Sequence, residues 1–124
     1  MGAILVIVLG IAAAKQQPRP KSIQMGAEMV LTSSSDPAIV LVPSTDFYFE
    51  QYHRSVSIGD SEGAMALLLD GDVLIVEVNT RVRVIDMGSS RHTADYSKYK
   101  VRMLEGSYAG ATGWVGRDSL GDGK

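Results

Sequence analysis

The sequence contains no cysteine and only two histidines, His53 and His92, among its 124 residues. Without cysteine, the chain cannot form disulfide bonds, thiolate metal sites or a lipid-modified cysteine anchor. For the same reason, cysteine usage does not indicate a redox compartment. The sequence also has no glycine-rich motif that would cradle a phosphate group. We therefore expect no cofactor and no metal.

Catalytic chemistry has few candidate residues. In Gly88–His92, His92 occupies the position where a nucleophile elbow needs its second glycine. A nucleophilic site built from Ser90, His92 and Asp95 would lie in a polar loop, without the rigid support that such sites need. A metal site built from Asp86, His92 and Asp95 would lack regular ligand spacing. We predict that the protein is not an enzyme.

Charge is nearly balanced overall but unevenly distributed along the chain. The formal net charge of −2 does not indicate a nucleic-acid partner. Residues 28–78 contain nine acidic residues and a single basic residue, Arg54, whereas residues 79–124 contain eight basic and five acidic residues. We interpret both regions as solvated faces of a small domain.

Residues 3–14 form an uncharged apolar run. As a helix, this run would span only about 18 Å, whereas a bilayer core needs about 30 Å. Its length fits a signal peptide, and Ala12 and Ala14 supply small residues at a cleavage site. The basic residues follow the run instead of preceding it: Lys15, Arg19 and Lys21.

The position of these basic residues leaves the membrane orientation open. Under the positive-inside rule, they would keep the C-terminal side in the cytoplasm. A start site further upstream would remove the conflict, because a longer apolar segment could span the bilayer. We predict that residues 1–14 are a signal peptide or membrane anchor, that residues 15–27 are a polar spacer, and that the protein is extracytoplasmic. A cytoplasm-facing anchor is the alternative.

Residues 28–71 predict an extended segment followed by a helical pair. Ala38–Val42 is rich in β-branched residues and lies between two prolines, which favours an extended segment. Asp46–Ser57 has helical spacing, and Asp60 can cap a second helix that ends before Gly71. We expect apolar side chains to face inward: Tyr48, Phe49, Tyr52 and Val56 on the first helix, and Met65, Leu68 and Leu69 on the second. With Phe47, the aromatic residues are predicted to pack the pair onto the following domain.

From Asp72 onward, apolar residues recur at every second position, which is typical of half-buried strands. The predicted strands are Val73–Glu77, Thr80–Ile85, Lys98–Met103 and a short strand that begins at Trp114. Met87–Tyr96 is polar and is predicted to be a mobile loop. Arg117–Leu120 predicts one helical turn, and residues 121–124 a disordered tail.

The order of these elements carries a family pattern. The pattern lies in four successive segments: Thr80–Val84, a polar loop, Val101–Gly106 and Gly110-x-x-Gly113-Trp114-Val115. In these segments, the C-terminal half resembles the bacterial SH3-like (Src-homology-3-like) domain family. The resemblance covers under half of the chain, and it implies a small closed β-barrel over residues 72–120. Closure is also favoured independently, because it hides the edges and the apolar face of short alternating strands.

The predicted fold class is therefore mainly β: a small SH3-like β-barrel preceded by a short helical pair (α+β) and an N-terminal apolar segment. The family resemblance implies binding rather than chemistry, with ligands that range from other proteins to cell-wall material. Polyproline recognition is not implied, because Val73–Glu77 lacks the A-L-Y-D-Y run of the eukaryotic peptide-binding members.

Two sets of residues are candidates for ligand binding. The family resemblance implies an aromatic surface near the loops, for which the candidates are Tyr96, Tyr99, Tyr108 and Trp114. Trp114 is also a candidate for the core, whereas Tyr96 and Tyr108 lie in loops that a ligand could reach. A cationic stripe is the second candidate site, with Arg83 and Arg102 as its main residues and Arg81, Lys98 and Lys100 beside them.

The stripe would lie on the outer face of two neighbouring strands, where it could bind an acidic partner, an anionic glycan or lipid headgroups. An ordinary solvated sheet face is the alternative. The function we predict is a non-catalytic binding module, membrane-anchored or exported, whose partner is an unknown protein or cell-envelope polymer. The alternative is a structural or assembly subunit whose acidic helical face meets a membrane-associated complex.

Overall fold

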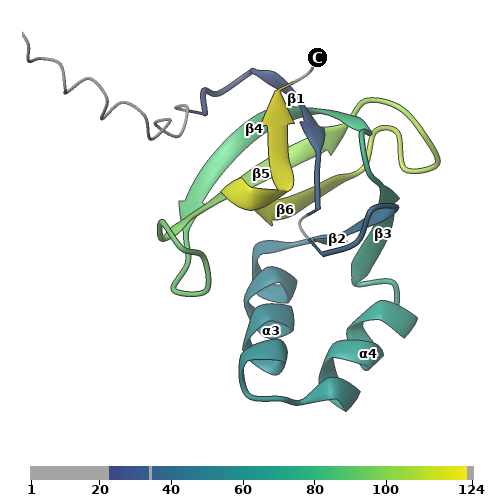
Figure 1. Ribbon diagram of the computed structural model, residues 1–124, viewed down its shortest axis with the longest axis vertical. Helices are drawn as coiled ribbons and strands as arrows, with labels where there is room; N and C mark the ends of the chain where they lie inside the picture. Colours follow the sequence, from purple (N-terminus) through teal and green to yellow (C-terminus); the bar gives the residue numbers. More distant parts are fainter. Residues whose placement is uncertain (1–22, 34, 123–124) are drawn as a thin grey trace, which may run out of the picture.

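The computed structural model describes residues 23–33 and 35–122, which form a mainly β fold with two helices (Figure 1). Its strands make two antiparallel sheets, and the helical pair lies beneath them in this view. The predicted signal peptide or anchor, residues 1–14, lies outside the described residues. Among the residues that are described, no helix is both long enough and apolar enough to cross a membrane.

The larger sheet has five strands in the order β6-β5-β4-β1-β7, and each neighbouring pair is antiparallel. Its strands are β1 (Glu28–Leu31), β4 (Arg81–Ser89), β5 (Ser97–Met103), β6 (Thr112–Gly116) and β7 (Leu120–Asp122), and the 3-10 helix η1 (Arg117–Ser119) joins the last two. Because side chains alternate between the two faces of a strand, one face collects the apolar residues. The buried residues of β4 and β5 on this face are Val82, Val84, Tyr99, Val101 and Met103.

The smaller sheet pairs β2 (Ile39–Pro43) with β3 (Val73–Glu77). Val40, Val42 and Val76 from this sheet join the larger sheet in one buried apolar cluster. The approach of β2 to β6 requires a glycine, because a Cβ on Gly113 would lie 2.8 Å from the carbonyl oxygen of Pro43. The G-W-V element therefore lets the two sheets pack closely.

The closed barrel predicted from the sequence is wrong for the described residues. The edge strands β6 and β7 do not pair with each other, so the larger sheet remains open. The smaller sheet packs onto the apolar face, which closure alone was expected to hide. Val73–Glu77 is also not the first strand of the larger sheet, because it pairs with β2, whereas β1 enters that sheet between β4 and β7.

The predicted helical pair is confirmed as α3 (Asp46–Ser57) and α4 (Ser61–Leu69). Both helices begin at the capping residues that the sequence offers. The backbone N–H of Tyr48 donates to Thr45 Oγ1 at 3.1 Å, and that of Gly63 donates to Asp60 Oδ1 at 2.9 Å. Local hydrogen bonding thus fixes where each helix starts.

The predicted inward faces of the helices are only partly correct. Phe49 is buried between α3 and the sheets, with 1% of its surface exposed, but Phe47 is 63% exposed and Val56 is also exposed. No side chain of α4 is fully buried, and Met65 and Leu69 face solvent rather than the interior. Helix α4 meets α3 at a glycine, because a Cβ on Gly63 would lie 3.0 Å from Ser55 Oγ.

Two boundaries also differ from those predicted. Strand β4 continues to Ser89, so residues 87–89 are paired with β5 instead of belonging to the mobile loop. Gly121 and Asp122, predicted as part of a disordered tail, pair with β1 as part of β7. The first difference comes from pairing within the β4–β5 hairpin, and the second from pairing with β1, which is distant in the sequence. The predicted helical turn is confirmed as η1.

Replacing Phe49 with alanine should destabilise the fold by about 3–5 kcal/mol, because a fully buried ring leaves a cavity. Phe47→Ala, on the same helix, is the matched control and should change the free energy of unfolding by less than about 0.5 kcal/mol. Urea unfolding followed by circular dichroism measures both. Equal effects of the two substitutions would contradict the packing of α3 described here.

Candidate binding cleft

A cleft of about 880 Å³ lies where the β6 edge of the larger sheet, strand β2 and helix α3 meet. Its other walls come from the loop between β1 and β2, the loop between β4 and β5, and η1. Ring side chains contribute much of the lining: Phe49, Tyr52, His53, His92 and Trp114. Elements from three separate parts of the chain therefore build this cleft.

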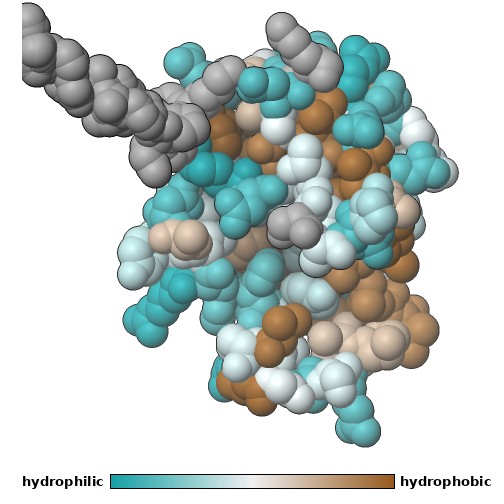
Figure 2. All heavy atoms as spheres, in the orientation of Figure 1, coloured by the Kyte–Doolittle hydropathy of each residue, from teal (hydrophilic) through white to brown (hydrophobic). Residues whose placement is uncertain are grey.

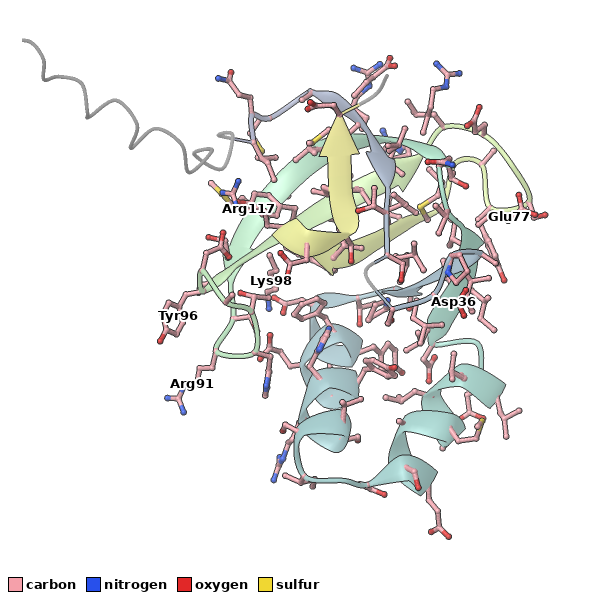
Figure 3. All side chains as sticks on the ribbon, in the orientation of Figure 1. Asp36, Glu77, Arg91, Tyr96, Lys98 and Arg117 are labelled. Carbon is pink, nitrogen blue, oxygen red and sulfur yellow. The ribbon has the colours of Figure 1, made fainter. Side chains whose placement is uncertain are left out.

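Lys98 joins the sheet to α3 beside the cleft. Its side chain is only 4% exposed, and its Nζ donates hydrogen bonds to Asp46 and, at 2.9 Å, to Glu50 Oε2. The same ammonium group lies 5.3 Å from the ring centroid of Phe49 and 5.5 Å from that of Trp114. Figure 3 shows Lys98 between β5 and the top of α3. Two carboxylates and two aromatic rings thus surround one buried cation.

The ion pairs hold these groups in their charged forms. Partial burial alone would raise the pKa of Glu50, but hydrogen bonds from Lys98 and Ser90 and the charge of Lys98 outweigh it, so the pKa is lowered. Burial alone would lower the pKa of Lys98, but its hydrogen bonds to Asp46 and Glu50 outweigh that effect and raise it. Lys98 and Glu50 are therefore both charged at neutral pH.

The two histidines come together on one wall of the cleft. The rings of His53 and His92 are nearly parallel, with centroids 6.2 Å apart, and His53 also lies 4.4 Å from the ring of Phe49. Burial, together with the charge of His92, lowers the pKa of His53, although Glu50 acts in the opposite direction. His53 is therefore neutral at pH 7, where its ring can stack or share hydrogen bonds with a ligand.

Arg117 of η1 holds another part of the cleft wall in place. Its Nε donates to Asp95 Oδ2 at 2.7 Å, and its Nη2 donates to the hydroxyl of Tyr99 at 3.1 Å. The hydrogen bond from Arg117 is the largest influence on Asp95 and lowers the pKa of that carboxyl. Tyr99 is buried and its hydroxyl is already engaged, so this predicted ligand residue supports the wall instead of facing a ligand.

The side chain of Thr93, in the wall of the cleft, has an unsatisfied hydroxyl group. Its Oγ1 is buried and has no hydrogen-bond partner among the described residues. Buried hydroxyl groups are nearly always satisfied in folded proteins. Thr93 Oγ1 is therefore an unsatisfied hydroxyl enclosed in the wall of the cleft.

The predicted aromatic surface is not a single groove. Tyr96 is 69% exposed in the β4–β5 loop and points away from the fold in Figure 3. Tyr108 lies in the β5–β6 loop, at the other end of β5, a strand roughly 20 Å long. Of the four candidates, only Trp114 lines the cleft, and it is also buried.

Three members of the predicted cationic stripe form ion pairs. Arg83 and Arg102 are register partners on β4 and β5, as expected for neighbours on one face. Arg83, however, pairs with Glu28 at 2.8 Å, and Arg81 pairs with Glu105 at 3.3 Å. Lys98, which the sequence also placed in the stripe, is buried beneath α3 and paired with Asp46 and Glu50. These ion pairs reduce the positive charge that the stripe can offer to a partner, and binding by Arg83 and Arg102 stays a prediction.

The Ser90, His92 and Asp95 side chains do not assemble as a nucleophilic site. Ser90 Oγ accepts from the backbone N–H of His92 at 3.1 Å, while Asp95 binds Arg117. The nearest carboxylate to the His92 ring in an ion pair is that of Glu50, at 3.7 Å. Across residues 23–33 and 35–122, no group of three or more His, Asp or Glu side chains could hold a metal ion.

Sequence reasoning did not identify Asp46, Glu50 or His53 as site residues, and it placed Lys98 in the cationic stripe instead of beneath α3. One signal was available: Asp46 and Glu50 are four residues apart on a helix, so they lie on one face with the apolar Phe49 beside them. Nothing local marks Lys98 as their partner, because it follows the alternation of an exposed strand face.

The comparisons with known proteins do not add a family. No protein-family model, no curated protein and no solved structure matches the chain. The function must therefore be argued from the cleft and its chemistry.

Replacing Glu50 with glutamine should lower the free energy of unfolding at pH 7 by about 1 kcal/mol, since a charged hydrogen bond is lost from a partly screened site. The folded pKa of Glu50 is depressed from 4.5, so its contribution is present above that pH and is lost as the pH falls through the folded value. The difference between wild type and variant should therefore shrink below about pH 4.

Urea unfolding between pH 3 and pH 7 measures this difference. Glu77→Gln is the control, because it removes an exposed carboxylate that lies outside the Lys98 cluster. A difference for Glu50→Gln that stays constant across this range would contradict the ion pair.

Proposed function

We propose that this chain is a non-catalytic binding module of the SH3-like type, membrane-anchored or exported, that holds a segment of a protein or of an envelope polymer in the cleft. The observation that carries the proposal is the cleft itself. Its volume of about 880 Å³ is within the range of ligand sites, and its lining combines rings with a few polar groups.

The order of the elements supports the SH3-like part of the proposal. Six elements occur in the order that the family pattern implies: strand β4, the loop that follows it, strand β5, the glycine-rich turn from Gly106, strand β6 and the helical turn η1. Gly113, Trp114 and Val115 of β6 are all buried, so the most specific motif of the resemblance has a packing role. The helical pair and the smaller sheet are inserted between β1 and β4.

The engagement of the charged groups suggests what kind of ligand fits. Asp95 and Arg117 bind each other, and Glu50 binds Lys98. Asp36 accepts hydrogen bonds from the backbone N–H groups of Ala38 and Ile39. With these charges satisfied, the cleft offers ring faces and hydrogen bonds, which suit a weakly charged chain such as a glycan strand or an extended peptide.

A second candidate function is a structural or assembly subunit. It is favoured by one observation: α4 contains five residues in a row from Met65 that are all apolar, yet the helix buries none of its side chains fully. Such a helix is stabilised when another surface covers it.

Titration with purified peptidoglycan glycan strands, and separately with unstructured peptides from envelope proteins, tests the binding proposal. At least one probe should perturb the NMR signals of Tyr52, His53, His92 and Trp114. Tyr52→Ala should weaken that binding about tenfold, because one ring contact is lost.

Tyr96→Ala is the matched control and should leave binding unchanged, since Tyr96 does not line the cleft. Perturbations centred on Tyr96 and Tyr108, or none in the cleft with either probe, would overturn the assignment of the cleft as the binding site.

A further inference from the structure

The exposed apolar surface of α4 and β3 lies apart from the cleft. We call this the α4 surface and define it by Met65, Leu69 and Ile75, of which Leu69 is 80% exposed. Met65 and Leu69 are four residues apart, so they lie on one side of the helix. Strand β3 follows α4 directly and contacts it, which brings Ile75 to the same region. Figure 2 shows apolar side chains gathered over α4 and the neighbouring part of β3.

None of these three side chains lines the cleft. A ligand in the cleft would therefore leave the α4 surface uncovered. Ile75 instead lines a small hollow that continues from β3 toward Glu77, Glu105 and Tyr108.

Acidic residues occur at both ends of the α4 surface. Asp60 and Glu62 lie at the start of α4, whereas Asp70 and Asp72 follow its end, and Glu77 ends β3. Between Ser44 and Thr80, the only Lys or Arg is Arg54 on α3. The negative charge of this region is therefore not balanced by neighbouring cations along the chain.

We propose that the α4 surface docks an amphipathic helical segment of another protein, with apolar side chains on one face and Lys or Arg at its flanks. The proposal deepens the second candidate function, the assembly subunit. Leucine-like side chains of the segment contact Met65, Leu69 and Ile75, as in other helix-binding surfaces. Its basic flanks lie against the acidic residues at the two ends of α4, which orient the segment and speed its association.

Charge complementarity selects this occupant over two others. A second copy of this chain would bring an identical acidic rim against the first, and like charges across an interface oppose association. An anionic lipid surface would be repelled for the same reason. A basic, apolar protein segment satisfies both the exposed leucine and the acidic rim.

The test uses the purified full chain and a synthetic peptide of about five helical turns, with leucines at helical spacing and lysines at both ends. Fluorescence anisotropy should detect binding that weakens as salt rises, because the flanking charges are screened. A peptide with glutamates in place of the lysines is the matched probe and should not bind.

The double variant Met65→Ser, Leu69→Ser should weaken binding at least about tenfold. Because both side chains are exposed, its urea midpoint should match that of wild type. Tyr52→Ala, a cleft variant, should bind the peptide like wild type, so that failure of the cleft and failure of the α4 surface are distinguished.

Three results would overturn the proposal. One is equal binding of the lysine and glutamate peptides, which would remove the role of the acidic rim. Another is a concentration-dependent dimer that the double serine variant abolishes, because the occupant would then be a second copy. The third is peptide binding that appears only when Lys15, Arg19 and Lys21 are replaced by glutamate, because the chain's own basic segment would then be the occupant.

Discussion

The buried ammonium group of Lys98 is the interaction on which the arrangement of this fold depends. It comes from β5, and its two carboxylate partners come from α3, so it connects the five-stranded sheet to the helical pair. A buried lysine that loses its partners is strongly destabilising, whereas an apolar side chain in its place can be tolerated. The two carboxylates of α3 therefore keep this buried charge paired where the helix meets the sheet. Phe49, on the same helix, provides the apolar contact at this position.

This placement of α3 creates the two surfaces for which we propose partners. On one side, α3 forms a wall of the cleft, which Tyr52 and His53 line. On the other side, α4 joins α3 through Gly63 and leaves its apolar residues in solvent. The cleft is lined by aromatic and histidine rings, and the charged side chains beside these rings form ion pairs with one another. The α4 surface is apolar with an acidic rim. The two surfaces differ in chemistry and do not overlap, so we propose a different partner for each.

Helix caps and side-chain alternation predict the helices and strands from the sequence. They do not predict which strands pair with one another. Thr45 and Asp60 supply helix caps, and alternation along residues 81–85 and 98–103 indicates strands, so these elements were identified from the sequence. Closure of a barrel was predicted because it would hide the apolar face, but β2 and β3 cover that face instead. Tyr96 and Tyr108 were grouped as one surface, although loops at opposite ends of β5 cannot meet. Lys98 has the sequence position of an exposed residue, and only the fold brings α3 over it.

The central claim is that Lys98 lies beneath α3 between two aromatic rings. Side-chain NMR of the full chain tests it most directly. The account predicts strongly upfield-shifted Lys98 Hε signals, with nuclear Overhauser contacts to the rings of Phe49 and Trp114, which lie 5.3 and 5.5 Å from Nζ. Random-coil shifts for Lys98 Hε without contacts to either ring would contradict it.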